Sequence, residues 1–166
     1  IPLHRILAVG LTVFQKRKDY VKALEYFEKS LALSRELKII EGIAFNLERI
    51  GQVMEAQNKL EEALSKYKEA LAIQEQAGQV YNTASVLKSL GSVYNTLNRT
   101  GEAVSCYERA LKAAQQIKSK NLIAEVSLSY AKLLKKNKDY KKAYYYWQQY
   151  SSLKDSILGE EKNKRM

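Results

Sequence analysis

Apolar residues along this chain recur at intervals of three and four, which is the spacing of one face of an α-helix. Leu47, Ile50 and Met54 form one such face, a second runs from Leu60 to Leu71, and the polar pair Asn58-Lys59 separates them. The same helix–hinge–helix pattern occurs four times. It predicts helix pairs at about residues 3–17 with 20–37, 41–57 with 60–77, 81–97 with 100–117, and 121–136 with 140–157.

The pattern has a period of forty residues and holds along the whole chain. Ala23, Ala63, Ala103 and Ala143 share one position in the repeat, Phe27, Tyr67, Tyr107 and Trp147 share another, and Leu11, Gly51, Gly91 and Ala131 share a third. Small residues let paired helices approach closely, so we expect Gly51 and Gly91 to lie where such helices touch. An internal repeat of this length predicts an all-α solenoid of four helix-turn-helix units.

The order of small and aromatic residues identifies the kind of repeat. The two middle repeats carry Gly51, Met54, Ala63, Tyr67 and Ala70, and then Gly91, Tyr94, Ala103, Tyr107 and Ala110. This order resembles the tetratricopeptide-repeat (TPR) signature, and the outer repeats match it more loosely. The resemblance implies a TPR array over residues 1–157 with repeats at about 1–40, 41–80, 81–120 and 121–157. It also implies a right-handed superhelix, followed by a charged helix extension or linker at 158–166.

One departure from the TPR signature indicates a subfamily. The proline that often ends the second helix is replaced by Arg35, Glu75, Gln115 and Asp155. Because proline cannot continue a helix, its absence allows longer second helices. The chain therefore resembles the long-helix, forty-residue TPR type.

Composition adds limits on compartment and topology. Apolar residues make up 46% of the chain, with a single proline, and no apolar run is long enough to span a membrane. The lone Cys106 cannot form an internal disulfide, and we interpret it as a small helix residue rather than a reactive thiol. The chain starts at Ile1 rather than at a methionine, so we expect it to be part of a longer protein. Cytoplasm and periplasm both stay open.

The residues that catalysis would need are scarce. His4 is the single histidine, the glycine-rich phosphate-binding motifs do not occur, and the adjacent acids Glu61 and Glu62 point to different sides of a helix. We therefore predict no enzymatic activity, no catalytic residue, no metal site, no cofactor and no small-molecule substrate.

The TPR resemblance implies that the first helix of each pair lines a concave face that binds a protein or peptide. Helical angles place the candidate residues opposite the apolar stripe. The predicted partner-binding residues are Phe45, Glu48, Gln52, Glu55, Lys88, Ser92, Asn95 and Lys132. Phe45 is the aromatic among polar neighbours, so we predict that it anchors a peptide or helix that crosses repeats two and three.

One known TPR site is missing. Cochaperone TPRs hold a C-terminal carboxylate with a clamp of lysine, asparagine and arginine residues. The matching positions here carry Ala8, Thr12, Arg49, Ser85 and Ser89. A chaperone-tail adaptor is therefore not expected.

Positive charge gathers late in the chain. The net charge is +10, and residues 116–150 hold eight basic and two acidic side chains. We call Lys132, Lys135, Lys136, Lys138, Lys141 and Lys142 the lysine cluster. It could attract nucleic acid, an anionic membrane or an acidic partner. Because nucleic-acid surfaces usually mix in arginine and stacking aromatics, a solvated helix hinge is the favoured interpretation and nucleic acid is disfavoured.

Aromatic residues follow the lysine cluster. Tyr140, Tyr144, Trp147 and Tyr150 have helical spacing, so we predict that they belong to the core. Tyr145 and Tyr146 should face elsewhere and cap the array or join an interface.

The C-terminal residues carry a second resemblance. Asp155, Ser156, Ile157, Glu160, Glu161, Lys162 and Lys164 resemble the junction between a TPR array and the output domain in bacterial signalling proteins such as sensor kinases and DNA-binding regulators. An ordinary charged helix end is the alternative. The leading interpretation is a sensory or regulatory interaction module. The two others are a standalone assembly scaffold and a nucleic-acid-associated regulator that uses the lysine cluster.

Overall fold

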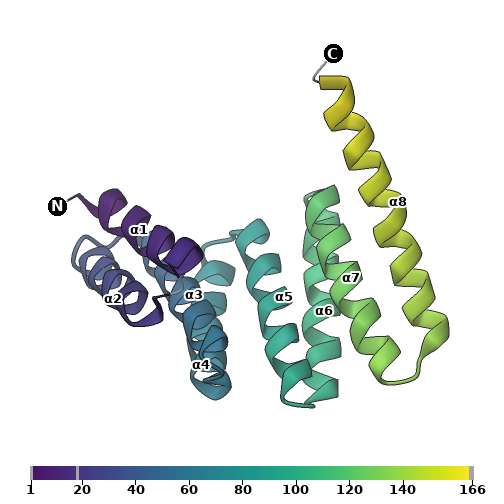
Figure 1. Ribbon diagram of the computed structural model, residues 1–166, viewed down its shortest axis with the longest axis horizontal. Helices are drawn as coiled ribbons and strands as arrows, with labels where there is room; N and C mark the ends of the chain where they lie inside the picture. The colour runs from purple at the N-terminus through teal and green to yellow at the C-terminus, as the bar shows by residue number, and fades with distance from the viewer. Residues whose placement is uncertain (1, 18, 165–166) are drawn as a thin grey trace. The chain divides into compact units, whose positions relative to one another are not determined.

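The protein is described by a computed structural model that covers residues 2–17 and 19–164. Helices account for nearly all of this part of the chain (Figure 1). The elements are α1 (Leu3–Thr12), the π-helical turn η1 (Val13–Arg17), α2 (Tyr20–Glu36), α3 (Ile40–Ala56), α4 (Leu60–Gln76), α5 (Val80–Thr96), α6 (Thr100–Gln116), α7 (Lys120–Lys136) and α8 (Tyr140–Lys164). The predicted all-α helical-repeat fold is confirmed. Ile1 and the last two residues of the predicted extension, 165–166, lie outside the described residues.

Turns of a single kind join the helices from α2 to α8 at intervals of twenty residues. Each turn has one residue with a left-handed backbone, with φ between 53° and 66°, at Lys38, Asn58, Gly78, Asn98, Lys118 and Lys138. In the turn after α3, the amide of Lys59 donates to the carbonyl of Met54 at 2.8 Å, which closes the helix end. From α2 to α7, a 17-residue helix and a three-residue turn thus make each half of the forty-residue repeat.

The helices form two compact units, which we describe one at a time. Unit 1 ends at Gln79 and contains α1 to α4, and unit 2 begins at Val80 and contains α5 to α8. In unit 1, α2 packs against α1 and α3, and α3 packs against α4. In unit 2, α6 packs against α5 and α7, α7 packs against α8, and α7 also contacts α5 (Figure 1).

Two glycines lie at the closest contacts between paired helices, as predicted. A Cβ atom on Gly51 would lie 2.8 Å from the Tyr67 ring, and one on Gly91 would lie 2.7 Å from the Tyr107 ring. Real Cβ atoms do not approach this closely, so a larger residue at either position would force the helices or the ring to move. Tyr67 and Tyr107 are buried beneath these glycines.

The first repeat departs from the forty-residue register. The sequence places Leu11 at the small-residue position, but the structure places Gly10 there. A Cβ atom on Gly10 would lie 2.9 Å from the Phe27 ring. The reason is η1, because a π-helical turn winds more residues than an α-helical turn and shifts the residues before it. Leu11 is half-buried instead.

The predicted core role of the aromatic residues at the start of α8 is wrong. Tyr140, Tyr144 and Trp147 are 64%, 58% and 51% exposed. Tyr150 is half-buried. Tyr145 is exposed, whereas Tyr146 packs on Tyr130 of α7, with ring centres 4.7 Å apart. Tyr140, Tyr144 and Trp147 lie on a side of α8 that no helix of the described chain covers.

Candidate protein-interaction surfaces

The face of α3 in unit 1 brings several predicted partner-binding residues together. Phe45 is half-buried, and the guanidinium group of Arg49 lies 4.7 Å from the centre of its ring. Arg49 also donates to Gln52 at 2.8 Å and to Glu48 at 3.3 Å. Glu48 is 5% exposed, so its carboxylate is held inside this group by charge and hydrogen bonds. The result is an aromatic ring with fixed polar groups beside it.

Glu55 has a second task within unit 1. The hydroxyl of Tyr67 on α4 donates to the carboxylate of Glu55 at 2.8 Å and so ties α3 to α4. Burial raises the pKa of Glu55, and the hydrogen bond from Tyr67 offsets part of that rise. The hydrogen bond between α3 and α4 thus fixes the position of the Glu55 carboxylate.

In unit 2, contacts with α7 occupy two of the predicted residues of α5. Lys88 pairs with Glu125 of α7. The backbone oxygen of Asn95 accepts from Lys136 at 3.0 Å, and the side chain of Asn98 accepts from the same amine at 2.8 Å. Ser92, between Lys88 and Asn95 in the sequence, is half-buried, and Lys132 on α7 is exposed. These bonds hold α5 and α7 in register.

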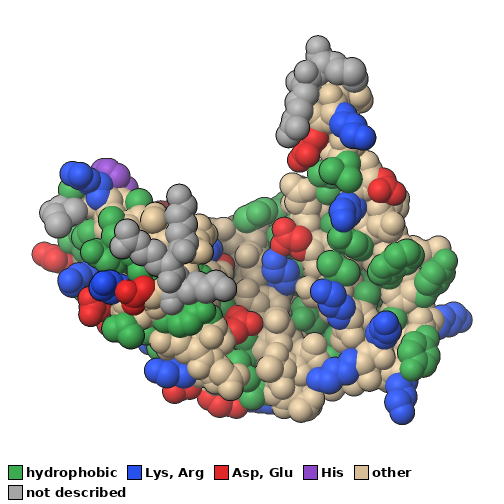
Figure 2. Space-filling view, in the orientation of Figure 1, with side chains coloured by type: hydrophobic (Ala, Val, Ile, Leu, Met, Phe, Trp, Pro, Cys, Tyr) green, Lys and Arg blue, Asp and Glu red, His purple; other side chains and the backbone are tan. Residues whose placement is uncertain are grey.

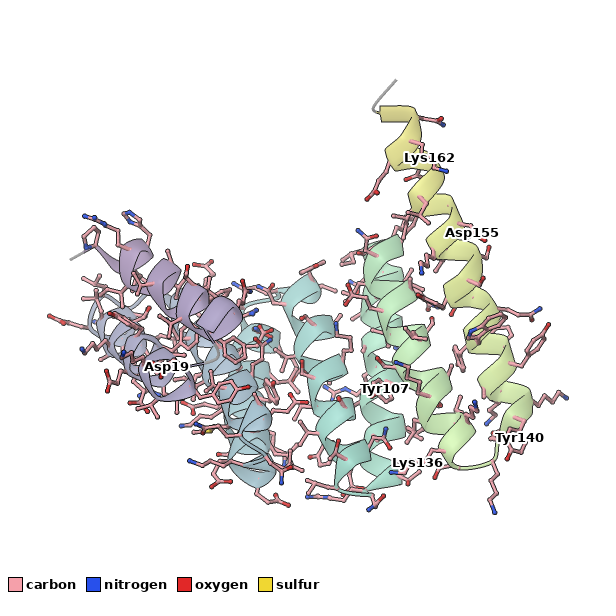
Figure 3. The ribbon with its side chains drawn as sticks, viewed as in Figure 1. Asp19, Tyr107, Lys136, Tyr140, Asp155 and Lys162 are labelled. Atoms are coloured by element: carbon pink, nitrogen blue, oxygen red, sulfur yellow. The ribbon has the colours of Figure 1, made fainter. Side chains whose placement is uncertain are left out.

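The lysine cluster is therefore divided between structure and surface. Lys136, labelled in Figure 3, places its charge at the C-terminal end of α5, where free carbonyl groups carry partial negative charge. Lys142 lies 3.8 Å from Asp139, whose side chain also accepts from the Lys142 amide and begins α8. Lys132, Lys135 and Lys141 are exposed.

An open groove lies between the C-terminal half of α7 and the N-terminal half of α8. It has a volume of about 390 Å³ and is lined by Leu128, Ala131, Lys132, Lys135, Tyr140, Ala143, Tyr144 and Trp147. We call it the α7–α8 groove. Figure 2 shows hydrophobic and basic side chains interspersed over this part of unit 2. Sequence reasoning missed the groove because it assigned three of the aromatic residues to the core.

A tyrosine cluster lies beneath the groove, where α6, α7 and α8 meet. The hydroxyl of Tyr130 donates to Glu108 of α6 at 3.1 Å, and the Tyr130 ring lies 5.7 Å from Tyr107 and 4.7 Å from Tyr146. Burial raises the pKa of Tyr130, and the negative charge of Glu108 raises it further. Burial also raises the pKa of Tyr146. The hydroxyl of Tyr130 is thus kept protonated as a donor.

Metal-binding groups and membrane-spanning helices are absent from the described residues. No group of three or more His, Cys, Asp or Glu in residues 2–17 and 19–164 could hold a metal ion. Within those same ranges, no helix is long and apolar enough to cross a membrane.

The sequence matches the family model described as "Tetratricopeptide repeat" at residues 9–76 and again at 43–116. Together these matches cover more than half of the chain. The chain belongs to the tetratricopeptide-repeat family. TPR repeats are typical of protein-interaction scaffolds without enzymatic activity, and the absence of activity in this TPR chain stays a prediction.

Solved structures with the same fold support the assignment. BtubC (BKLC) from P. vanneervenii superposes with a TM-score of 0.82 at 20% identity, over 95% of this TPR chain and 65% of that protein. Aspartyl phosphate phosphatase F from Bacillus subtilis superposes with a TM-score of 0.71 at 16% identity, over 92% and 49%. This chain thus spans less than two thirds of either protein. A comparison with curated proteins gave no match.

Proposed function

We propose that this TPR chain is a protein-interaction module that binds a peptide or helix of a partner on the polar faces of its first helices. The observation that carries this proposal is the group around Phe45 on α3. A half-buried aromatic ring is held there beside the guanidinium of Arg49, which also donates to the side-chain oxygen of Gln52. An aromatic anchor with fixed hydrogen-bonding groups at its edge is typical of an interface hot spot.

Unit 2 offers a second such face on α5 and α7. Ser92 and Lys132 are accessible there, while Lys88 and Asn95 are bonded to α7 and present a rigid polar edge. Rigid side chains lose little conformational freedom when a partner binds, which favours affinity. Partner binding on this face would therefore not require the helices to rearrange.

We further propose that the module belongs to a bacterial signalling protein. Two observations support this context: the resemblance of residues 155–164 to the junction of such proteins, and the fold shared with an aspartyl phosphate phosphatase from Bacillus subtilis. The junction residues Asp155 and Lys162 lie on α8, which is one continuous helix to Lys164 (Figure 3). Hydrogen exchange tests the context: a bound peptide should change amide protection along residues 155–162, and unchanged protection would favour a simple scaffold.

The binding proposal is tested with peptides selected on the immobilised chain from a random phage-displayed library. We expect Phe45→Ala to weaken the selected peptides by about 1–2 kcal/mol, because the ring would fill the central pocket of the interface. Titration calorimetry gives the affinity, and circular dichroism melting shows that the variant is folded.

The matched control is Ser65→Ala, which changes an exposed residue on α4. It should leave both the affinity and the melting temperature unchanged. Equal affinities for the wild type and for folded Phe45→Ala would show that Phe45 is a packing residue, and the α3 face would then be the wrong site.

A further inference from the structure

Helix α7 shows how one helix packs on the preceding helix pair, α5 and α6. Its contacts with α5 and α6 include three that mark its length: Glu125 with Lys88, Tyr130 with the ring of Tyr107, and Lys136 with Asn95 and Asn98. The first contact lies near the start of α7, the second near its middle and the third at its end. Unit 2 thus contains an observed template for one helix seated on two others.

The α7–α8 groove presents the same surface one repeat later. The equivalent residues, forty positions later, are Leu128 for Lys88, Trp147 for Tyr107, Lys135 for Asn95 and Lys138 for Asn98. Leu128, Trp147 and Lys135 line the groove, and Lys138 follows at the end of α7. Trp147 is 51% exposed, while its counterpart Tyr107 is buried under Gly91 and beside Tyr130. The surface for a helix is therefore present, and no helix of the described chain lies on it.

The chemistry of the groove differs from the template in a way that selects the occupant. Where Asn95 and Asn98 accept hydrogen bonds from Lys136, the groove offers the amines of Lys135 and Lys138. A lysine of an incoming helix would be repelled there, whereas a carboxylate would be attracted. Lys132 also lines the groove. The acid at this end of the hairpin, Asp139, already holds the first turn of α8 and Lys142.

The rest of α8 argues against another repeat helix packed as closely as α7. Ala110 and Ala114 of α6 are fully buried, and their counterparts on α8 are Tyr150 and Lys154. Tyr150 and Lys154 line a separate open pocket beside Ala124 and Glu125 of α7. Their large side chains would be overpacked by a helix seated on this half of α8 as closely as α7 is seated on α6. The groove therefore suits a short helix that contacts only the end near Trp147.

We propose that the α7–α8 groove binds a short amphipathic helix of a partner protein, with a large apolar residue against Trp147 and, six residues further on, an acidic residue against Lys135 and Lys138. The spacing is that of Tyr130 and Lys136 in the template. This inference goes beyond the proposed function, because the groove shares only Lys132 with the proposed face of α5 and α7, is otherwise formed by other residues of α7 and by α8, and has a partner of defined charge.

The probe is a hydrocarbon-stapled peptide with the sequence of residues 126–138 and the substitution Lys136→Glu. The matched control peptide retains Lys136. Trp147 is the single tryptophan of the chain, so its emission reports occupancy directly. We expect the acidic peptide to shift this emission to shorter wavelength, saturably, and to bind about tenfold or more tightly than the control.

Charge reversal on the protein completes the test. In the folded double variant Lys135→Glu/Lys138→Glu, the order of the two peptides should invert, while Phe45→Ala should leave both affinities unchanged. Three results would each overturn the proposal: no saturable shift with either peptide, equal affinity for the two, or displacement of the acidic peptide by a DNA oligonucleotide. A shift on raising the concentration of the chain alone would assign the groove to a second copy and also overturn it.

Discussion

Helices α6 and α8 hold the same place in successive repeats, yet the face that carries Tyr107 is buried in α6 and the face that carries Trp147 is open in α8. Tyr107 of α6 is 1% exposed and its counterpart Trp147 of α8 is 51% exposed. The two residues are forty positions apart, and α6 pairs with α5 as α8 pairs with α7. What differs is the covering helix: α7 lies on α6, and no helix of the described chain lies on the corresponding side of α8. Burial in a solenoid thus depends on the neighbour as much as on the repeat position.

The side chains of the two helices reflect this difference. α6 carries Ala110 and Ala114, which are fully buried, and close packing of helices needs small residues. α8 carries Tyr150 and Lys154 at the same positions, and both have large side chains with polar ends. Such residues tolerate water. The sequence of α8 therefore differs from that of α6 at two positions that are fully buried in α6.

The comparison predicts unequal costs for the same truncation. Tyr107→Ala should lower the free energy of unfolding by about 3–5 kcal/mol, because it leaves a cavity under Gly91. Trp147→Ala should cost only about 1–2 kcal/mol, since half of its surface is already in water. Urea unfolding followed by circular dichroism measures both. Equal costs would show that Trp147 is a core residue and that the groove is closed in solution.

The second prediction concerns the glycine that lets α5 approach α6. Gly91→Leu should destabilise the chain by about 1–3 kcal/mol, because even its Cβ would lie 2.7 Å from the Tyr107 ring. The matched control is Gly101→Leu in the first turn of α6, where a Cβ would meet nothing within 4 Å. The control should be neutral or slightly stabilising, since leucine favours helix more than glycine does. An unchanged melting temperature for Gly91→Leu would contradict the assigned helix contact.

The sequence predicted most of the fold because the repeat supplies the same information several times. The bounds of α3 to α7 agree with the predicted ranges to within one residue, and Gly51 and Gly91 lie at the predicted contacts. Helical periodicity and the need for a small residue at a close contact were sufficient for this. The exception in the fold is Gly10, because a π-helical turn has no signature in the hydrophobic pattern.

The candidate sites were predicted less well, for two physical reasons. Periodicity identifies the apolar face of a helix but does not show whether another helix covers it, so Tyr140, Tyr144 and Trp147 were assigned to the core. Helical angles likewise do not show which polar residues bond to each other. Lys88 and Glu125 are 37 residues apart in the sequence, so their pairing depends on how α5 and α7 pack. The replacement of Ala110 and Ala114 by Tyr150 and Lys154 was the available signal for the open face.

The smallest expected effect lies where α6, α7 and α8 meet. Tyr130→Phe removes the hydrogen bond to Glu108, so at neutral pH it should cost about 0.5–1.5 kcal/mol. Burial raises the pKa of Tyr130 in the folded state above its ordinary value of 10.0, so the folded state binds the proton more tightly than the unfolded state. The stability from this group is therefore complete below pH 10 and is lost as the pH rises above it.

The variant lacks the titrating hydroxyl, so the difference in unfolding free energy between the wild type and Tyr130→Phe should shrink between neutral pH and about pH 10.5. Tyr146, whose pKa is also raised, remains in both proteins and leaves part of the alkaline loss in each. Tyr140→Phe, at an exposed position on α8, is the control and should match the wild type at neutral pH. Urea unfolding at a series of pH values measures the three proteins together. A constant difference in unfolding free energy between the wild type and Tyr130→Phe would mean that the Tyr130 hydroxyl titrates as freely in the folded chain as in the unfolded one. Water would then reach the tyrosine cluster despite α7.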